Sequence, residues 1–465
     1  MPPLRSPVRL GVVLACLILA SNVAVAQYGP IITASGPVNR SMGGVAVATP
    51  LSPSSATYWN PATLSGFDRS QVDFGAEMLL IDSSLASRFA ANAFGAGVPP
   101  IPLAGQTKSN STVYPLPNAG LVYRPEDQPR LALGMSLNAV AGFGVDYPGS
   151  QTNPILSPRA PVGVGAGPIF SDYQVLQINP AASYQLTDRL SVGGGPTIDL
   201  GRLQFNPGQS LRPDDANGDG FANYPSALQT RNSWGAGFIL GLYYRGDTWA
   251  TGFSYKSTQW SEPFRYNTTD EIGRPRNALV HLELPMLCSW GLSYTGFDRW
   301  VLSTDLRYLN YANARGYGGQ GFTGFGSAAG LGFENVFAVA VGAQYRATDR
   351  LTLRSGYSYG SNPIPDGQTS FNLASSTIIE HTVTVGASWA VTDSLSMNVA
   401  YLHGFKNSIT GPLVLPAGAV PGTSLTSSVG FDSIAFGASV AFGPTRRPSC
   451  LVRSNATTEI PAVVE

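Results

Sequence analysis

The sequence has few charged residues, and side chains with catalytic chemistry are scarce. Charged residues make up 12% of the 465 residues, about half of the share found in an average soluble domain. Positive and negative charges balance to a formal net charge of zero, which gives no sign of nucleic-acid binding. Only three histidines occur, His281, His381 and His403, and their spacing fits no metal site. No catalytic constellation is found, so the sequence does not predict an enzyme.

Long apolar runs and cysteine pairs are also scarce. Beyond the N-terminus there is no run of roughly 18 apolar residues, which excludes a protein that crosses a membrane with helices. Two cysteines remain after residue 26, Cys288 in an expected strand and Cys450 in the C-terminal tail, and nothing indicates a disulfide. Glycine, by contrast, is abundant at 53 residues. These properties leave two fold classes, a soluble all-β protein and a membrane β-barrel.

The first 26 residues are expected to be a secretory signal peptide. Arg5 and Arg9 provide the positive charge, residues 10–20 form the apolar stretch, and Ala24-Val25-Ala26 offers a cleavage site. The protein is therefore expected to be exported.

An aromatic residue four positions before an aspartate recurs six times. Aspartate favours tight turns because its side chain accepts hydrogen bonds from the following backbone, and an aromatic ring before the turn suits a membrane–water boundary. The six pairs are Tyr123/Asp127, Tyr184/Asp188, Tyr243/Asp247, Tyr294/Asp298, Tyr345/Asp349 and Trp389/Asp393. Six tight turns at one boundary, joined by long loops at the other, predict an up-and-down barrel that crosses a bilayer.

Alternation of apolar with small or polar residues predicts long strands around these turns. The expected strands are residues 68–81, 111–124, 130–147, 172–186, 189–204, 231–245, 248–260, 278–295, 299–312, 334–347, 350–361, 376–391, 394–407 and 430–443. Their number is even, as in single-chain bacterial barrels, and the short turns and both chain ends are expected on the periplasmic side. The predicted fold class is all-β, a 14-stranded antiparallel transmembrane barrel over residues 67–443.

Two segments fall outside the predicted wall. Residues 27–66 are rich in Gly, Ala and Ser and precede the first strand, so we expect them to form a hatch that plugs the lumen. Residues 444–465 are polar, and we expect them to form a disordered periplasmic tail.

At this point the chain resembles the FadL/TodX-type family of outer-membrane transporters for long-chain fatty acids and other hydrophobic compounds. The opening of the mature chain carries most of the resemblance, in residues 41–48 and 55–62. Further matching stretches are residues 133–138, 142–144, 178–184, 284–285, 291–294 and 353–359. The resemblance spans residues 28–443 and implies a 14-stranded barrel with an N-terminal hatch, in agreement with the strand count.

The resemblance also implies a route for the substrate. It places Asn60, Pro61 and Ala62 in the hatch, although Asn-Pro also commonly begins a plain turn. It places Gly142, Phe143 and Gly144 at a break in strand 3, where substrate would leave sideways through the wall. Two glycines around one residue weaken strand pairing and permit a bulge. The alternative is that these glycines only relieve crowding in the wall.

The loop after the first predicted strand is unusually apolar for an exposed segment. Leu85, Phe89, Phe94 and Ile101 are candidate ligand-binding residues, because such a loop can capture a hydrophobic molecule. The alternative is that these side chains pack against neighbouring loops.

A predicted external loop carries part of a calcium-binding pattern. Asp215, Asn217 and Asp219 occupy ligand positions 1, 3 and 5, and Gly220 occupies the turn position, but Ser226 replaces the bidentate Glu. Calcium is therefore a candidate structural ion, and a plain Asp/Asn/Gly turn explains the same residues. No other cofactor is expected.

Together these observations predict passive uptake of long-chain fatty acids or other hydrophobic compounds across the outer membrane. The expected partners are a hydrophobic small molecule, outer-membrane lipid and the barrel assembly machinery, with the protein acting as a monomer. The alternative function is a non-specific porin, or a barrel that serves as an adhesin or structural anchor.

Overall fold

The structure, a computed structural model, describes residues 28–111 and 113–445. The expected signal peptide and nearly all of the expected C-terminal tail lie outside the described residues. In the described part of the chain, no helix is both long enough and apolar enough to cross a membrane.

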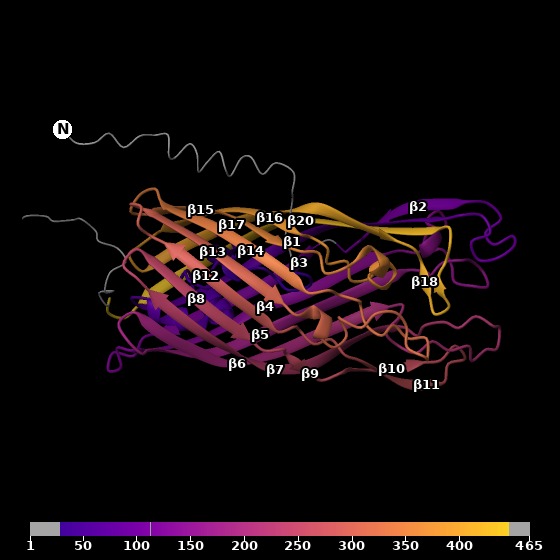
Figure 1. The fold of residues 1–465 in the computed structure, drawn as a ribbon, viewed down its shortest axis with the longest axis horizontal. Coiled ribbons are helices and arrows are strands. Elements are labelled where there is room, and N and C mark those ends of the chain that lie inside the picture. Colours follow the sequence, from indigo (N-terminus) through magenta and orange to yellow (C-terminus); the bar gives the residue numbers. More distant parts are fainter. Residues whose placement is uncertain (1–27, 112, 446–465) are drawn as a thin grey trace, which may run out of the picture.

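A closed antiparallel barrel forms the body of the molecule (Figure 1). The main sheet has 16 strands, two of which, β2 (Leu103–Lys108) and β9 (Trp260–Ser261), are short additions to its outer part. The 14 wall strands are β1 (Ser70–Phe89), β3 (Val113–Tyr123), β4 (Leu131–Tyr147), β5 (Ile169–Gln185), β6 (Leu190–Asn206), β7 (Ala227–Arg245), β8 (Trp249–Lys256), β12 (Leu287–Tyr294), β13 (Trp300–Leu309), β14 (Val336–Arg346), β15 (Leu351–Gly360), β16 (His381–Ala390), β17 (Leu395–Gly411) and β20 (Thr423–Phe442). The barrel closes because β1 pairs with β20 on one side and with β3 on the other.

Short and long connections alternate along the wall, as the sequence predicts. All six aspartate turns join neighbouring wall strands, and the long connections lie at the other end of the barrel (Figure 1). The long connections carry two hairpins, β10 (Phe264–Thr269) with β11 (Pro275–Val280) and β18 (Val414–Leu415) with β19 (Gly418–Ala419), and the 3-10 helices η2 (Pro154–Leu156), η3 (Tyr311–Asn313) and η4 (Asp366–Phe371).

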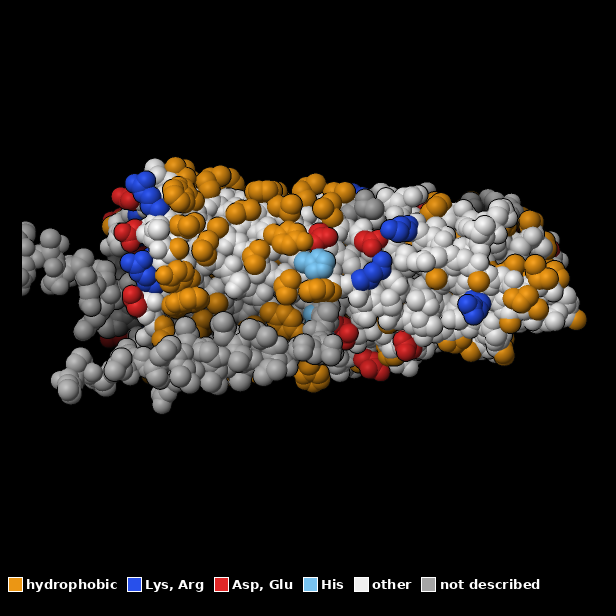
Figure 2. All heavy atoms as spheres, turned by 90° about the horizontal axis from the view of Figure 1, so that it is seen from above, with side chains coloured by type: hydrophobic (Ala, Val, Ile, Leu, Met, Phe, Trp, Pro, Cys, Tyr) orange, Lys and Arg blue, Asp and Glu red, His pale blue; other side chains and the backbone are white. Residues whose placement is uncertain are grey.

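A band of apolar side chains covers the outer surface next to the short turns. Figure 2 shows this band between a rim of charged side chains at the turn end and scattered charges farther along the barrel. Exposed aromatic rings border it, with Tyr123, Tyr184 and Trp389 each about half exposed. The prediction that the Tyr243 ring lies at the membrane–water boundary is wrong, because this residue faces the lumen and packs against Ala62.

Some predicted strand ends are also wrong. β1 continues eight residues past the predicted end at 81, because β1 and β20 stay paired as far as Phe89 and Thr423. The prediction of one strand over 278–295 joins the end of β11 to β12, although residues 281–286 leave the sheet between them. Some wall strands therefore extend beyond the apolar band, into segments that the sequence predicts as long loops.

Residues 28–66, called the inner segment below, fold inside the barrel (Figure 1). Three short helices build this segment, α2 (Gly36–Arg40), α3 (Pro53–Trp59) and η1 (Pro61–Gly66). Ser52 is the N-cap residue of α3, and its side chain accepts the backbone N–H of Ser55 in a capping box, while Pro53 is the first residue of the helix. All residues of α2 and α3 are buried, because the wall surrounds them.

Candidate transport pocket

The wall has a gap between β3 and β4. These two strands pair only from Tyr123 and Leu133 to Asn118 and Asn138, near the short-turn end. Beyond this point β3 continues to pair with β1, and β4 continues to pair with β5 as far as Tyr147. Residues 113–117 of β3 therefore have no partner on β4, and the closed barrel opens locally at this place.

Two prolines mark the side of the gap that β3 forms. Pro115 and Pro117 lack a backbone N–H, and proline in a sheet is confined to edge strands, strand ends and bulges. Both fall in the unpaired part of β3, which has the character of an edge strand inside an otherwise closed wall.

A β-bulge and the inner segment shape the other side. The register between β4 and β5 shifts between Ala139 and Ala141, so Val140 is the extra residue that bends β4. The inner segment then pairs with the exposed edge of β4: the Ile32 N–H donates to the Val140 carbonyl oxygen (2.9 Å), and the Gly142 N–H donates to that of Pro30 (2.9 Å). These two bonds satisfy backbone groups that β3 leaves unpaired.

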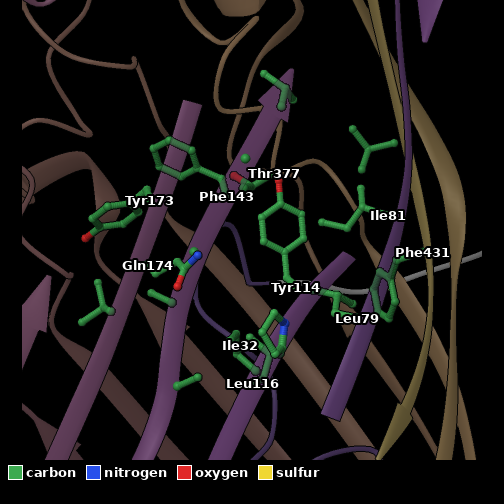
Figure 3. A pocket seen from close by; sticks show the side chains of 18 of the residues that line it. Ile32, Leu79, Ile81, Tyr114, Leu116, Phe143, Tyr173, Gln174, Thr377 and Phe431 are labelled. Atoms are coloured by element: carbon green, nitrogen blue, oxygen red, sulfur yellow. The ribbon is translucent and has the colours of Figure 1, made fainter. Parts of the chain in front are cut away.

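A cavity of about 200 Å³ occupies the gap (Figure 3). Its lining comes from β1, β3, β4, β5, β20, the inner segment and the residues before β16. The side chains and backbone that form it are those of Ile32, Leu79, Ile81, Ser83, Tyr114, Pro115, Leu116, Pro117, Ala139, Ala141, Gly142, Phe143, Gly144, Val145, Tyr173, Gln174, Val175, Leu176, Ser376, Thr377, Ile379, Val429 and Phe431. Most of these residues are aliphatic or aromatic, so the cavity is a predominantly apolar pocket in the wall, called the wall pocket below.

The polar groups of the wall pocket are uncharged. Among the described residues, no Lys, Arg, His, Asp or Glu lines it. The Tyr114 hydroxyl pairs with Ser111 (2.6 Å), and the buried hydroxyl of Thr377 has no hydrogen-bond partner in the described part of the chain. The pocket therefore offers an apolar surface with a few hydroxyl and amide groups.

Comparison with known sequences decides the family of this barrel. A sequence model described as outer membrane protein transport protein (OMPP1/FadL/TodX) matches residues 15–442, which is nearly the whole chain. The chain belongs to the FadL/TodX family. Members of this family are outer-membrane transport proteins, so the protein resides in the outer membrane and transports hydrophobic compounds. No curated protein matches the chain.

Solved structures of FadL/TodX-type proteins share the fold at low sequence identity. The toluene transporter TbuX of Ralstonia pickettii is 19% identical with a TM-score of 0.62, and the match covers 88% of this chain and 99% of TbuX. The toluene transporter TodX of P. putida is 18% identical with a TM-score of 0.65, over 89% and 99% of the two chains. A FadL homologue of Pseudomonas aeruginosa is 17% identical with a TM-score of 0.65, over 89% and 100%.

The three residues predicted at the lateral opening of this FadL/TodX barrel all line the wall pocket. Gly142, Phe143 and Gly144 lie on β4 just after the bulge, and the Phe143 ring packs 4.9 Å from that of Tyr173. A Cβ on Gly144 would overlap the hydroxyl of Tyr114, so this glycine lets β3 and β4 share the narrow gap. The break in pairing itself comes from the bulge at Val140 and the prolines of β3, which the sequence analysis did not use.

The predicted loop residues lie elsewhere. Leu85 and Phe89 are in β1 instead of a loop, and both are fully buried in a cluster with residues of β4 and η2. Phe94 packs edge-on against Phe89 with ring centroids 5.3 Å apart, and Ile101 is 63% exposed. None of these four residues lines the wall pocket. Leu85, Phe89 and Phe94 pack in one apolar cluster, whereas Ile101 is exposed, and a role of these residues in ligand capture stays a prediction from the sequence.

The Asn60-Pro61-Ala62 motif ties the inner segment to the wall. Asn60 ends α3 and begins η1, and its side-chain oxygen accepts the Ala62 N–H (3.1 Å). Its amide nitrogen donates to the carbonyl oxygens of Val47 (2.7 Å) and Leu242 (3.0 Å), the second of which lies on β7. Asn60 therefore both closes the helix turn and anchors it to the barrel.

A buried ion pair on β13 attaches the inner segment to the wall at a second place, separate from the contacts of Asn60. Arg307 on β13 donates to Asp305 (2.7 Å), to the Tyr28 hydroxyl (2.8 Å) and to the Gly44 carbonyl oxygen (2.6 Å). Asp305 in turn accepts the backbone N–H of Ala46 (2.8 Å). Burial raises the pKa of the Tyr28 phenol, so this group stays neutral and accepts the bond from Arg307.

Glycines on the inner face of the wall let the inner segment approach closely. A Cβ on Gly241 would overlap the Asn60 side chain, and one on Gly252 would overlap the Val47 carbonyl oxygen. Close backbone approach is one of the roles that glycine has in strands. Close contact with the inner segment explains part of the high glycine content, whose role the composition alone does not show.

The residues that match part of a calcium-binding pattern lie on an exposed loop between β6 and β7. The Asp215 carboxylate accepts the Gly220 N–H (3.1 Å), and the Asn217 side-chain oxygen accepts the Asp219 N–H (3.0 Å), as in a plain Asx turn. In residues 28–111 and 113–445, no group of three or more His, Cys, Asp or Glu residues could hold a metal ion. Calcium binding stays a prediction from the sequence.

Proposed function

We propose that this protein takes up small, uncharged hydrophobic molecules by passive diffusion through the wall pocket and releases them sideways between β3 and β4. The observation that carries the proposal is an apolar pocket set in the one stretch where β3 and β4 are unpaired. In this proposal the inner segment is the hatch that keeps the lumen closed.

The faces that line the wall pocket support sideways release. On β5, Tyr173 and Val175 are buried on the lumen side, whereas Gln174 and Leu176 are half-buried on the outer side. All four line the same pocket. Lining from both faces of the wall supports a route from the lumen to the outer surface that avoids the polar layer outside the membrane.

The chemistry of the wall pocket favours uncharged molecules over fatty acids. A carboxylate in an apolar site requires a cation or several donors, and no Lys or Arg lines this pocket. Buried cations elsewhere in the lumen already have partners: Arg40 pairs with Glu77, Arg307 pairs with Asp305, and Lys256 donates to Gln177. The volume is also suited to one compact molecule, because a dry apolar cavity of about 150 Å³ binds benzene.

Two other functions make different predictions. Long-chain fatty acids remain a substrate candidate of the FadL/TodX fold, and they would require a charged partner to enter the pocket. A non-specific porin would require an open lumen, whereas here the inner segment is buried among wall side chains. Both are outcomes of the experiment below.

The test is uptake of labelled toluene and labelled oleate by a transport-deficient bacterium that expresses the full chain. We expect toluene uptake above the level of cells without the protein, and little oleate uptake. Leu79→Trp should abolish toluene uptake, because Leu79 lines the wall pocket. Leu80→Trp is the matched control, since Leu80 is 41% exposed on the outer face of the same strand.

Heat-dependent gel mobility would show that both variants fold. Oleate uptake without toluene uptake would overturn the preference for uncharged molecules. Equal toluene uptake by wild type and Leu79→Trp would overturn the route through the wall pocket.

A further inference from the structure

A second, smaller cavity lies beside the wall pocket and contains a buried carboxylate. It has a volume of about 20 Å³, enough for one water-sized group. It lies among β5, β6, β7, β9 and the β10–β11 hairpin, and Asp199 of β6 lines it together with Ser233, Gln259, Ser261 and Phe264. This cavity is called the Asp199 recess below.

The recess and the wall pocket share two lining residues. Tyr173 and Val175 of β5 line both cavities. Figure 3 shows Tyr173 at one side of the wall pocket, with its hydroxyl pointing away from Tyr114 and Leu79. A substrate whose apolar body fills the wall pocket thus lies next to a polar compartment.

One oxygen of Asp199 has no partner. Asp199 is 4% exposed; its Oδ1 accepts a hydrogen bond from the Gln177 amide (2.6 Å), and its Oδ2 has no hydrogen-bond partner in the described part of the chain. An unsatisfied buried carboxylate oxygen is costly, so a donor that reaches it is bound favourably.

The neighbouring polar groups leave the recess in need of a donor. The hydroxyl of Ser233 donates to the Glu262 carbonyl oxygen (2.5 Å), and that of Ser261 donates to the Leu282 carbonyl oxygen (2.9 Å). Both hydroxyl protons are therefore already used. The Gln259 amide, which also lines the recess, donates to the Ser257 carbonyl oxygen (2.8 Å) and accepts from Thr197 (2.5 Å). The free oxygen of Asp199 therefore remains as an acceptor for a group that enters the recess.

The charge of Asp199 is balanced by Lys256, which indicates a neutral donor. The Lys256 ammonium donates to the Gln177 side-chain oxygen (3.0 Å) and lies 3.8 Å from the centre of the Tyr58 ring, and it does not line the recess. Gln177 thus bridges the ammonium and the carboxylate. Because Asp199 and Lys256 together are neutral, the Lys256 ammonium would repel an added cation, whereas a hydroxyl group adds no charge.

We infer that Asp199 is a specificity-determining residue that accepts a hydrogen bond from the hydroxyl group of an aromatic or aliphatic alcohol. The apolar body of that substrate occupies the wall pocket, and its hydroxyl enters the recess past Tyr173. This inference rests on the proposed uptake of uncharged hydrophobic molecules, and it adds that hydroxylated substrates are preferred over equally sized substrates that can only accept hydrogen bonds.

The test compares uptake of three labelled probes by cells that express the full chain: toluene, 4-methylbenzyl alcohol and 4-methylbenzaldehyde. In Asp199→Asn the side-chain oxygen would still accept from Gln177, and the amide nitrogen would replace Oδ2, which turns an acceptor into a donor. We expect the alcohol-to-aldehyde uptake ratio to fall roughly tenfold, the size of one hydrogen bond to a charged group. Toluene uptake should not change.

Asp432→Asn is the matched control. Asp432 lies on the outer face of β20, where it accepts hydrogen bonds from Tyr401 (2.6 Å) and His403 (2.8 Å), and it lines neither cavity. This variant should keep the wild-type ratio. An unchanged ratio in a folded Asp199→Asn protein that still takes up toluene would overturn the inference and leave the recess as the site of one water molecule.

Calorimetric titration of purified barrels in detergent separates this inference from the proposed transport. We expect 4-methylbenzyl alcohol to bind wild type roughly tenfold more tightly than Asp199→Asn. Equal affinity would overturn the role of Asp199 even if toluene uptake succeeds. Failure of toluene uptake together with this affinity difference would overturn the transport route and keep the recess as a hydroxyl site.

Discussion

At the scale of single residues, the lumen is stabilised by paired charges instead of an apolar core alone. Arg307 and Asp305 are both fully buried, and the Arg307 guanidinium lies 3.7 Å from the centre of the Trp59 ring. Most bonds of this pair go to the backbone or the hydroxyl of the inner segment. Because β13 carries both charges, the pair connects the inner segment to a rigid part of the wall.

Replacing Arg307 should therefore destabilise the protein strongly. In Arg307→Met the Asp305 carboxylate would stay buried without its ion pair, at an expected cost of about 3–5 kcal/mol. Urea unfolding of the barrel refolded in lipid vesicles measures this loss of unfolding free energy.

The double variant Arg307→Met with Asp305→Asn is the control for charge. It removes both charges, so it should regain part of the lost stability. Equal loss in the single and double variants would show that packing against Trp59, and not the ion pair, stabilises the inner segment.

At the same scale, some residues that line the wall pocket and the Asp199 recess follow from the sequence, and others do not. Gly142 and Gly144 could be found because the resemblance marks them. Pro115 and Pro117 carried a signal of their own, since proline inside a predicted wall strand indicates an unpaired edge. Asp199 and Tyr173 could not be found, because alternation places them on the inner face without showing which neighbours they meet.

At the scale of elements, the bulge in β4 decides where the wall opens. Before the bulge Ser136 and Asn138 face the lumen, and after it Ala141 and Val145 do. The extra residue switches the inward-facing positions from even to odd numbers, so Ala141 and Val145 face the lumen where β4 bends away from β3.

Deleting Val140 should close the wall. Without the extra residue, inward and outward side chains would alternate regularly through residues 138–141. β4 could then continue alongside β3 and pair with it, except at the N–H groups that Pro115 and Pro117 lack. We expect a folded barrel that has lost toluene uptake. Heat-dependent gel mobility and labelled uptake measure the two properties, and a folded deletion variant with wild-type uptake would contradict the role of the gap.

Strand ends are another property of whole elements that the sequence predicts poorly. The predicted first strand stops at residue 81, where its apolar alternation weakens, but the backbone hydrogen bonds to β20 continue to Phe89. Alternation reports contact with lipid, whereas backbone pairing continues into the polar region outside the membrane. Leu85 and Phe89 therefore lie in β1, although the alternation of the sequence predicts a loop there.

At the scale of the whole molecule, a barrel of 14 strands is wide enough to need a filled lumen. The inner segment supplies this filling with α2, α3 and η1, all buried against wall strands. In the proposed mechanism the lumen stays closed, and the substrate uses the wall pocket.

Removing residues 28–66 should convert the protein into an open pore. We expect stable conductance in planar lipid bilayers from this deletion variant and none from the full chain, because the lumen would then contain water. Purified, folded barrels of both forms are compared at equal amounts. Large conductance from the full chain would favour the porin alternative.

The class of the fold, the number of wall strands and the turns that join them follow from the sequence alone. Alternation and aspartate turns are local properties, so they can be recognised without knowing which strands meet. Only the tertiary structure decided where the wall opens and which side chains line that opening. The wall pocket joins Ile32, Leu79, Tyr173 and Phe431, which lie far apart in the chain, and their meeting depends on barrel closure, on the bulge at Val140 and on the position of the inner segment.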